Sequence, residues 1–233
     1  MQKRLFPRIA AAATAVLFLA ACGQPRPTGS AEVLLHTTAG DIRIELDGRT
    51  PLHRDNFLKL TREGFFDSVL FHRVIADFMI QAGDPASRRA PAGKMLGEAD
   101  AGYLIPAEIV YPALAHTRGA LAAARTPDEM NPDRKSSGSQ FYIVWGNTFE
   151  DEVIDRMQER ISAATDGRIV IPDSLRALYK TIGGTPFLDG QYTVFGRVTE
   201  GLEVVEAIQG VETDPAGRPL EDVRILSAEV VEK

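Results

Sequence analysis

Apolar and polar residues alternate in two short segments near the start of the chain, at 33–36 and 42–46, which are joined through Ala39-Gly40-Asp41. A period of two on either side of a Gly-Asp turn is typical of a β-hairpin. Short apolar runs of the same kind recur along the chain between Gly- and Pro-rich loops, and we predict strands in SVLFHRVI, FMIQAGD, GALAAAR, SQFYIVWG and YTVFGRVT.

Two segments show helical spacing around these strands. Thr50 and Pro51 can begin a helix with Phe57 and Leu60 on one face, and Gly64 can end it. The late segment LEVVEAIQG, at 202–210, repeats apolar residues on one face and ends in glycine. Many short strands with an early and a late helix predict a mainly β fold, a closed antiparallel barrel with two helices over its ends.

A third region, about 150–183, does not follow the rhythm of the strands. EDEVIDRMQERISAA and IPDSLRALYKTIGG both place apolar residues at helical spacing. We therefore predict a helical insertion packed on the barrel.

The first residues carry a basic start and then an apolar run, 9–21, that stops at Cys22. This run is short for a membrane span, and its pattern is that of a secretory signal. Leu-Ala-Ala-Cys at 19–22 resembles a bacterial lipobox, although an ordinary signal peptide followed by a chance cysteine would look similar. We predict a signal peptide at 1–21, lipidation of Cys22 with a flexible tether to residue 30, and a domain at 31–233 anchored in the bacterial envelope, facing the periplasm.

Composition narrows the classes of function. The formal charge is −6, and removal of residues 1–21 would take away three positive charges and no negative one, which makes it −9. An acidic chain without a basic patch argues against a nucleic-acid partner. Cys22 is the only cysteine, so the chain can form neither an internal disulfide nor a cysteine metal cluster.

One charged residue stands in an apolar run: Arg73 in FHRVIADFMIQAGDP, at 71–85. A guanidinium held against apolar neighbours is costly unless it is paired or has a task. It is either a structural, ion-paired arginine or part of a site. The run alone does not decide between these.

The segments FHRVIADFMIQAGD, SSGSQFYIV and FLDGQYTVFGRVTEGLEVVEAI occur together and in this order. They resemble the signature segments of the cyclophilins, which are peptidyl-prolyl cis/trans isomerases. The resemblance covers roughly Val33 to the C-terminus apart from the helical insertion. It implies a cyclophilin-like barrel, isomerase activity with no cofactor and no metal, and a monomer that binds proline-containing segments of envelope proteins.

The resemblance also implies roles for individual residues. Arg73 takes the place of the catalytic arginine, and the matching substrate-binding positions are Phe78, Met79, Gln81, Ala124, Gln140, Tyr142 and Leu188. From pattern alone, Phe78, Met79 and Leu188 could be ordinary core residues. Because Phe78 and Gln81 are three apart, strict alternation puts them on opposite faces, so we expect a twist or bulge after Asp77.

Three substrate-binding positions depart from the pattern of the resemblance. Phe187 stands where the best-known members have Trp, Tyr192 where they have His, and Arg125 where Asn would follow Ala124. The loss of the Trp N–H donor puts binding of cyclosporin-type inhibitors in doubt.

Two other functions remain open at this point. If Arg125 or Tyr192 blocks the groove, the protein would be a proline-peptide-binding chaperone module with weak or no turnover. A structural envelope lipoprotein that uses the barrel only as a scaffold would show no dependence on Arg73. His72, beside Arg73, is expected to be structural, because the isomerisation transfers no proton.

Overall fold

The computed structural model describes residues 29–231. The predicted signal peptide, Cys22 and most of the predicted tether lie outside the described residues. No helix among residues 29–231 is long and apolar enough to cross a membrane.

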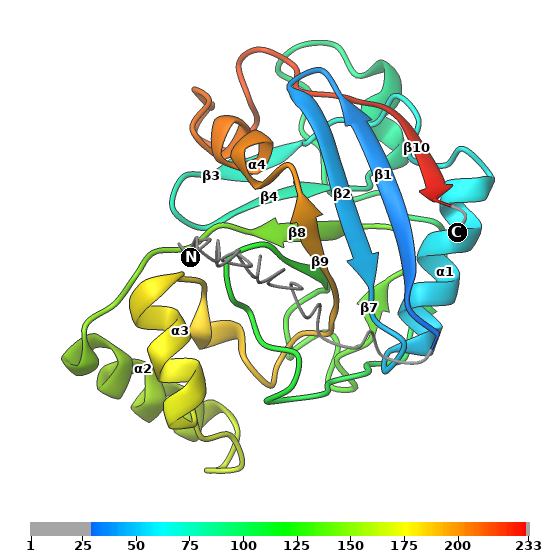
Figure 1. Cartoon of the computed structure of the whole chain (residues 1–233). Helices are drawn as coiled ribbons and strands as arrows, with labels where there is room; N and C mark the ends of the chain where they lie inside the picture. The colour runs from blue at the N-terminus through cyan, green and yellow to red at the C-terminus, as the bar shows by residue number, and fades with distance from the viewer. Residues whose placement is uncertain (1–28, 232–233) are drawn as a thin grey trace, which may run out of the picture.

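The predicted hairpin forms β1 (Ala31–Thr37) and β2 (Gly40–Leu46), which pair antiparallel throughout their length. Alternate side chains of both strands face the interior, as the period of two requires. The fully buried members are Val33, Leu35, Ile42, Ile44 and Leu46. This hairpin lies next to the β10 edge of a larger sheet (Figure 1).

The main sheet has eight strands in the order β10-β1-β2-β9-β6-β8-β4-β3, and all of its neighbouring pairs are antiparallel. Short β5 and β7 form a separate pair. The predicted strands exist, although most are shorter than predicted. Their bounds are β3 Arg73–Ile75, β4 Met79–Ala82, β5 Leu104–Ile105, β6 Ala120–Ala123, β7 Ser136–Ser137, β8 Phe141–Val144, β9 Val194–Glu200 and β10 Ile225–Val231.

The sheet curls but does not close into a barrel, which corrects the expectation of a closed one. Its edges are β3 and β10, and no ladder joins them. Strand β3 is only three residues long, and its free edge bonds to a loop, with Val74 N donating to the carbonyl of Gly217 at 2.7 Å. Ahead of β3, a single bridge joins Leu70 to Arg224. Backbone hydrogen bonds from the segment before β3 to the start of β10 and the loop before it, such as Ser68 N to the carbonyl of Ile225 at 2.8 Å, span the gap without forming a ladder.

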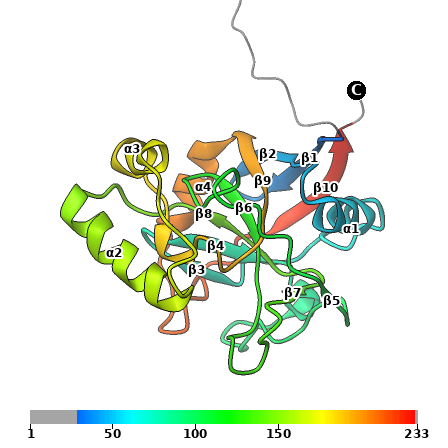
Figure 2. The ribbon, with the colours of Figure 1, turned by 90° about the horizontal axis from the view of Figure 1, so that it is seen from below.

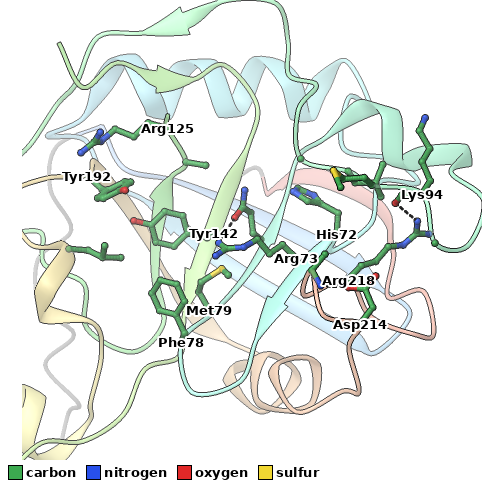
Figure 3. A pocket seen from close by; sticks show the side chains of 18 residues that line it. His72, Arg73, Phe78, Met79, Lys94, Arg125, Tyr142, Tyr192, Asp214 and Arg218 are labelled. Carbon is green, nitrogen blue, oxygen red and sulfur yellow. Dashed lines mark hydrogen bonds between the residues drawn. The ribbon is translucent and has the colours of Figure 1, made fainter. Parts of the chain in front are cut away.

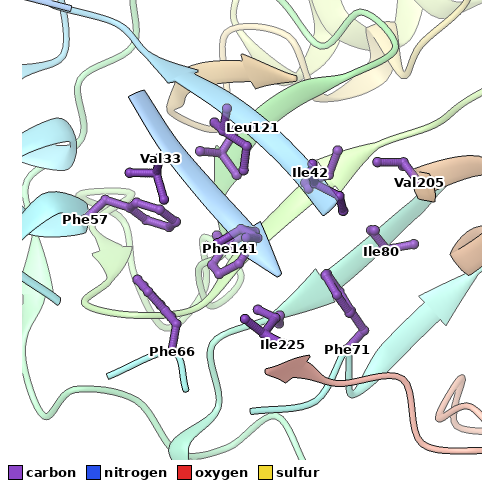
Figure 4. Packing of buried hydrophobic residues seen from close by; sticks show 14 of the residues in the cluster. Val33, Ile42, Phe57, Phe66, Phe71, Ile80, Leu121, Phe141, Val205 and Ile225 are labelled. Atoms are coloured by element: carbon purple, nitrogen blue, oxygen red, sulfur yellow. The ribbon is translucent and has the colours of Figure 1, made fainter. Parts of the chain in front are cut away.

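Helices α1 (Pro51–Arg62) and α4 (Leu202–Gln209) cover the curled sheet, as predicted. α1 packs on β1, β9 and β10, and α4 packs on β2, β3 and β4. Phe57 of α1 stacks on Phe66 with ring centroids 4.6 Å apart, and the edge of Phe141 meets both rings. Figure 4 shows these aromatic rings beside the side chains of the hairpin in the main core.

The part of the sheet formed by β6, β8 and β4 is covered on both faces. Ile80 of β4 and Ile143 of β8 point into the main core, whereas Met79 and Tyr142 belong to a second apolar cluster on the other face. Strands buried on both faces read as continuous apolar runs rather than alternating ones. This second face carries the candidate site.

The segment predicted to be helical contains α2 (Asp151–Ala164) and α3 (Asp173–Thr181), which lie together at one side of the sheet (Figure 2). A separate apolar cluster joins them to the rest of the molecule. It contains Ala115, Ile154, Ile161, Ile171, Leu175 and Tyr179. Two 3-10 turns complete the fold, η1 (Pro85–Arg89) and η2 (Pro186–Leu188).

Candidate active site

A cavity of about 400 Å³ opens on the second face of the sheet. It combines apolar walls with a few charged groups, which is typical of a ligand pocket. Its lining includes Arg73, Phe78, Met79, Gln81, Ala124, Arg125, Tyr142, Leu188 and Tyr192. The structure therefore brings together nine of the eleven residues that the sequence places at the catalytic and substrate-binding positions.

The backbone between β3 and β4 explains how Phe78 and Gln81 reach the same cavity. Met79 and Gln81 lie on one face of β4 because they are two residues apart. Phe78 lies in the turn before the strand, after Asp77, whose φ is 58°. The expected bend therefore occurs at Asp77, and it frees Phe78 from the alternation of β4.

Arg73 is half-buried and is oriented by a chain of side-chain amides. Its Nη1 donates to Oε1 of Gln81 at 3.2 Å, and Nε2 of Gln81 donates to Oε1 of Gln140 at 2.9 Å. Gln140 is not part of the cavity lining. It lies behind Gln81 and donates to the carbonyls of Gly97 and Ala99, both at 2.8 Å.

Arg73 has no ion pair within residues 29–231, and its bond to Gln81 is the only side-chain hydrogen bond that it makes there. A guanidinium has five N–H donors in a planar arrangement. Most of them are therefore available to a ligand in the cavity. The structural, ion-paired reading of Arg73 is not supported by these contacts.

Phe78, Met79, Tyr142 and Leu188 form the apolar half of the cavity. Met79 and Tyr142 are only 1% and 5% exposed, and the second apolar cluster continues beneath them. These residues are both core residues and pocket residues, because one surface of this cluster forms the wall of the cavity. Figure 3 shows Arg73 between this half and a second, more polar half.

The three departures from the resemblance leave the cavity open. Phe187 is 38% exposed and lies outside the lining, where its ring packs on Phe78 at a centroid distance of 5.7 Å. The guanidinium of Arg125 lies 4.3 Å from the ring centroid of Tyr192 and is paired with Asp128 at 2.6 Å. Arg125 is thus folded against the wall and held there.

The polar half of the cavity was not predicted. It is lined by the loop at 93–97 and by Asp214, Ala216 and Arg218. These residues lie in loops without periodic pattern or recognisable motif, and only the folded chain brings them beside β3. The one signal available was the glycine content of the first loop, which indicates close backbone approach but not to which partner.

His72 also lines the cavity, although its side chain is buried. Burial, which disfavours the imidazolium form, lowers its pKa from 6.5 to about 4; the Asp84 carboxylate opposes this shift and the Arg73 charge adds to it. His72 is therefore neutral near pH 7. Within residues 29–231, no group of three or more His, Cys, Asp or Glu is placed to hold a metal ion.

Comparisons with known proteins identify the family of the chain. Residues 32–230 match the family model described as cyclophilin type peptidyl-prolyl cis-trans isomerase/CLD. A candidate peptidyl-prolyl cis-trans isomerase of Staphylococcus saprophyticus is 34% identical over 203 residues, which are 86% of this chain and 92% of the relative. One from Staphylococcus aureus is 35% identical over 205 residues, covering 88% and 93%.

Solved structures show the same fold. A cyclophilin type peptidyl-prolyl cis-trans isomerase of Cryptosporidium parvum matches 88% of this chain and 99% of its own with a TM-score of 0.61 at 22% identity. The same protein, crystallised in the presence of the dipeptide Ala-Pro, matches with a TM-score of 0.60 at 24% identity, covering 87% of this chain and 99% of its own. From the family match and the identity to curated relatives, this chain belongs to the cyclophilin-type peptidyl-prolyl cis-trans isomerases.

Proposed function

We propose that the protein accelerates rotation about X–Pro bonds during the folding of envelope proteins, and that Arg73 stabilises the prolyl nitrogen as it becomes pyramidal. The observation that carries this proposal is the position of Arg73. It is held by Gln81 at the edge of an apolar hollow and has no ion pair within the described residues.

The reaction needs little chemistry from the protein. The barrier to rotation, ~18–20 kcal/mol, comes from amide resonance, and no bond to carbon breaks. As the prolyl nitrogen leaves the plane of the amide, it gains a lone pair that can accept a hydrogen bond. A donor aimed at this nitrogen therefore binds the transition state more tightly than the planar ground state, which is what lowers a barrier.

The cavity supplies the remaining requirements. The walls formed by Phe78, Met79, Tyr142 and Leu188 suit a pyrrolidine ring, and they exclude water, which stabilises the planar amide. Gln81 lines the cavity where it can bind the flanking peptide, and Gln140, which lies behind it, holds the Gln81 side chain in place. One side of the bond would then be held while the other rotates. The Ala-Pro dipeptide used with the Cryptosporidium relative supports the choice of proline-containing peptides as substrates.

We infer the cellular location of the protein from its first 30 residues. The apolar run that ends at Cys22 supports export and lipid attachment, which would keep the domain at a membrane facing the periplasm. Two or more acyl chains, at ~0.8 kcal/mol per buried methylene, suffice for stable attachment.

A protease-coupled assay on a short X–Pro peptide tests the activity. We expect turnover by the natural protein and a fall in kcat/KM of roughly 10²–10³ in Arg73→Ala, as when one preorganised donor is lost. Arg73→Lys should recover little, because an ammonium lacks the planar arrangement of donors. The matched control is Arg43→Ala, a half-buried strand arginine outside the cavity. No turnover by the natural protein would refute the function, and full activity of Arg73→Ala would refute the role of Arg73.

A further inference from the structure

A chain of four buried side chains connects the apolar half of the cavity to helix α3. It runs from Tyr142 of β8 through His116 and Asp189 to Tyr179 of α3. Their exposed fractions are 5%, 1%, 0% and 0%, in that order. The four residues come from four separate parts of the sequence, so their meeting is a property of the fold.

The centre of this chain is the carboxylate of Asp189. Its Oδ1 accepts from the backbone N–H of His116 at 2.9 Å and lies 3.0 Å from Nδ1 of the same residue. Its Oδ2 accepts from the hydroxyl of Tyr179 at 2.6 Å. A carboxylate that is fully buried is costly unless its oxygens are hydrogen-bonded in this way. Asp189 therefore fixes the positions of both partners.

The same contacts indicate which atom of each pair donates when the ring of His116 is neutral. An ionised carboxylate can only accept, so Nδ1 of His116 carries the proton that it donates to Asp189. In the neutral form of the ring with its proton on Nδ1, Nε2 accepts from the hydroxyl of Tyr142, 3.0 Å away. Rotation of any of these four side chains would break a buried hydrogen bond.

The backbone packs closely around these four hydrogen-bonded side chains. Gly184 passes between His116 and Tyr179 with a φ of +151°, and a Cβ there would meet the carbonyl oxygen of His116 at 2.2 Å and Cε1 of Tyr179 at 2.9 Å. The strand-like contact of Thr185 N with the same carbonyl, at 2.8 Å, holds this passage in place.

The hydrogen-bonded series from Tyr179 to Tyr142 contacts the cavity at two residues. Tyr142 lies in the lining and pairs with Gln81 across β4 and β8. Leu188, the residue before Asp189, is also in the lining. The carboxylate of Asp189 thus positions an aromatic ring through His116 and an aliphatic wall through the backbone.

We propose that His116 and Asp189 are positioning residues that hold Tyr142 and Leu188 against the substrate's proline ring, and that Tyr179 couples α3 to the affinity of the cavity for peptide. This inference rests on the proposed function, because it takes the apolar half of the cavity as the proline site. Contact with the ring is made in the ground state and the transition state alike. Loss of positioning should therefore raise KM and leave kcat unchanged, unlike loss of Arg73.

Tyr179→Phe tests the coupling from outside the cavity, because it removes only the hydroxyl that donates to Asp189. We expect KM to rise about fivefold, because only part of the free energy of this charge-assisted hydrogen bond reaches the cavity through Asp189 and His116, with kcat unchanged. The matched control is Tyr111→Phe. Tyr111 packs against the same helical segment, and its hydroxyl donates to the carbonyl of Val170 at 3.0 Å rather than to Asp189. A KM that stays unchanged in Tyr179→Phe, or rises equally in Tyr111→Phe, would overturn the proposal.

A double-mutant cycle tests the route. In a Tyr142→Phe background the His116 end of the chain has lost its donor, so Tyr179→Phe should raise KM by clearly less than in the natural protein. Equal effects in both backgrounds would contradict transmission through Tyr142.

Two measurements keep the proposal testable if a variant fails to fold or if the assay shows no turnover. NMR of the natural protein with ¹⁵N-labelled histidine should show His116 protonated at Nδ1 and accepting at Nε2, and the opposite tautomer would refute the chain. Titration of each folded variant with an Ala-Pro peptide should give the same fivefold loss of affinity without any turnover. Such a result would separate a failure of the proposed catalysis from a failure of this inference.

Discussion

Arg73 and Gln81 are directly opposite each other in the pairing of β3 with β4, and the guanidinium donates to the amide oxygen at 3.2 Å. The hydrogen bonds of Gln140 determine which atom of the Gln81 amide faces Arg73 in this contact. Gln140 lies against the carbonyls of Gly97 and Ala99, which can only accept, so its NH₂ faces them and its oxygen faces Gln81. The NH₂ of Gln81 must then face Gln140, which leaves the oxygen of Gln81 for Arg73.

Replacement of Gln81 by leucine should therefore disorient Arg73 without removing it. We expect kcat/KM to fall about tenfold, because one charge-assisted hydrogen bond that positions the donor is lost. The fall should be smaller than that of Arg73→Ala, since the donor itself remains. The protease-coupled assay on an X–Pro peptide measures both variants side by side.

Gln158→Leu is the matched control for that change. Gln158 is also half-buried and bonds to the carbonyl of Ile169 and the backbone N–H of Ile171, but it lies on α2 outside the cavity. Its substitution should leave kcat/KM unchanged. If Gln81→Leu were as active as the natural protein, Arg73 would not depend on the amide chain for its orientation.

His72 gives a prediction for acid stability. Its pKa is about 4 in the folded protein and 6.5 when unfolded, so between these values the unfolded chain binds more protons. The His72 shift by itself should lower the free energy of unfolding by about 3 kcal/mol as the pH drops from 6.5 to 4, and this contribution should be absent in His72→Gln. Urea unfolding of both proteins at intervals across that range measures the difference.

The same shift leaves His72 neutral from pH 6 to 8, where turnover should vary little because arginine stays charged and no proton is transferred. A bell-shaped profile centred near neutrality would implicate His72 as an acid or base. Parallel stability curves for the natural protein and His72→Gln would show that folding does not lower the pKa of His72.

The sequence predicts the elements well where a single period governs them. The hairpin of β1 and β2 and the helices α1 and α4 each bury one face, and burial of that face is visible as alternation or helical spacing. The sequence analysis predicts no strand at β10, and its prediction that the sheet closes into a barrel is wrong. Closure depends on whether the two edge strands are long enough to pair, which no local pattern records.

Part of the candidate site could likewise be predicted from the sequence, and part could not. Residues of β4 and β8 could be predicted as pocket residues because three motifs in order carry the resemblance. The loop at 93–97, the loop at 214–218 and the contact of His116 with Asp189 depend on chain segments far apart in sequence. Their side chains have no fixed spacing, so only tertiary structure brings them together.

The N-terminal segment gives a prediction about anchoring. Cys22→Ser should abolish labelling with a radioactive fatty acid and move the protein from the membrane fraction to the soluble or unprocessed fraction, because no thiol remains for the lipid. Isomerase activity per folded molecule should not change. Normal membrane retention of Cys22→Ser would rule out the lipobox.

Arg125 distinguishes an isomerase from a peptide-binding module with a blocked groove. Its side chain is 3% exposed, lies over the ring of Tyr192 and is paired with Asp128. Because the guanidinium is held against the wall, Arg125→Ala should not increase kcat/KM. The variant should instead lose about 1–2 kcal/mol of unfolding free energy, through the lost cation–π and ion-pair contacts. Urea unfolding and the peptide assay measure the two effects separately.

Arg134→Ala is the control for that variant, because Arg134 also pairs with Asp128, at 2.7 Å, and does not line the cavity. It should cost less stability than Arg125→Ala, since it has no aromatic ring beneath it, and it should not affect turnover. A severalfold gain in kcat/KM for Arg125→Ala, with no gain for Arg134→Ala, would mean that Arg125 moves into the groove in solution. The natural protein would then be mainly a peptide-binding module, restrained by the residue that replaces the expected asparagine.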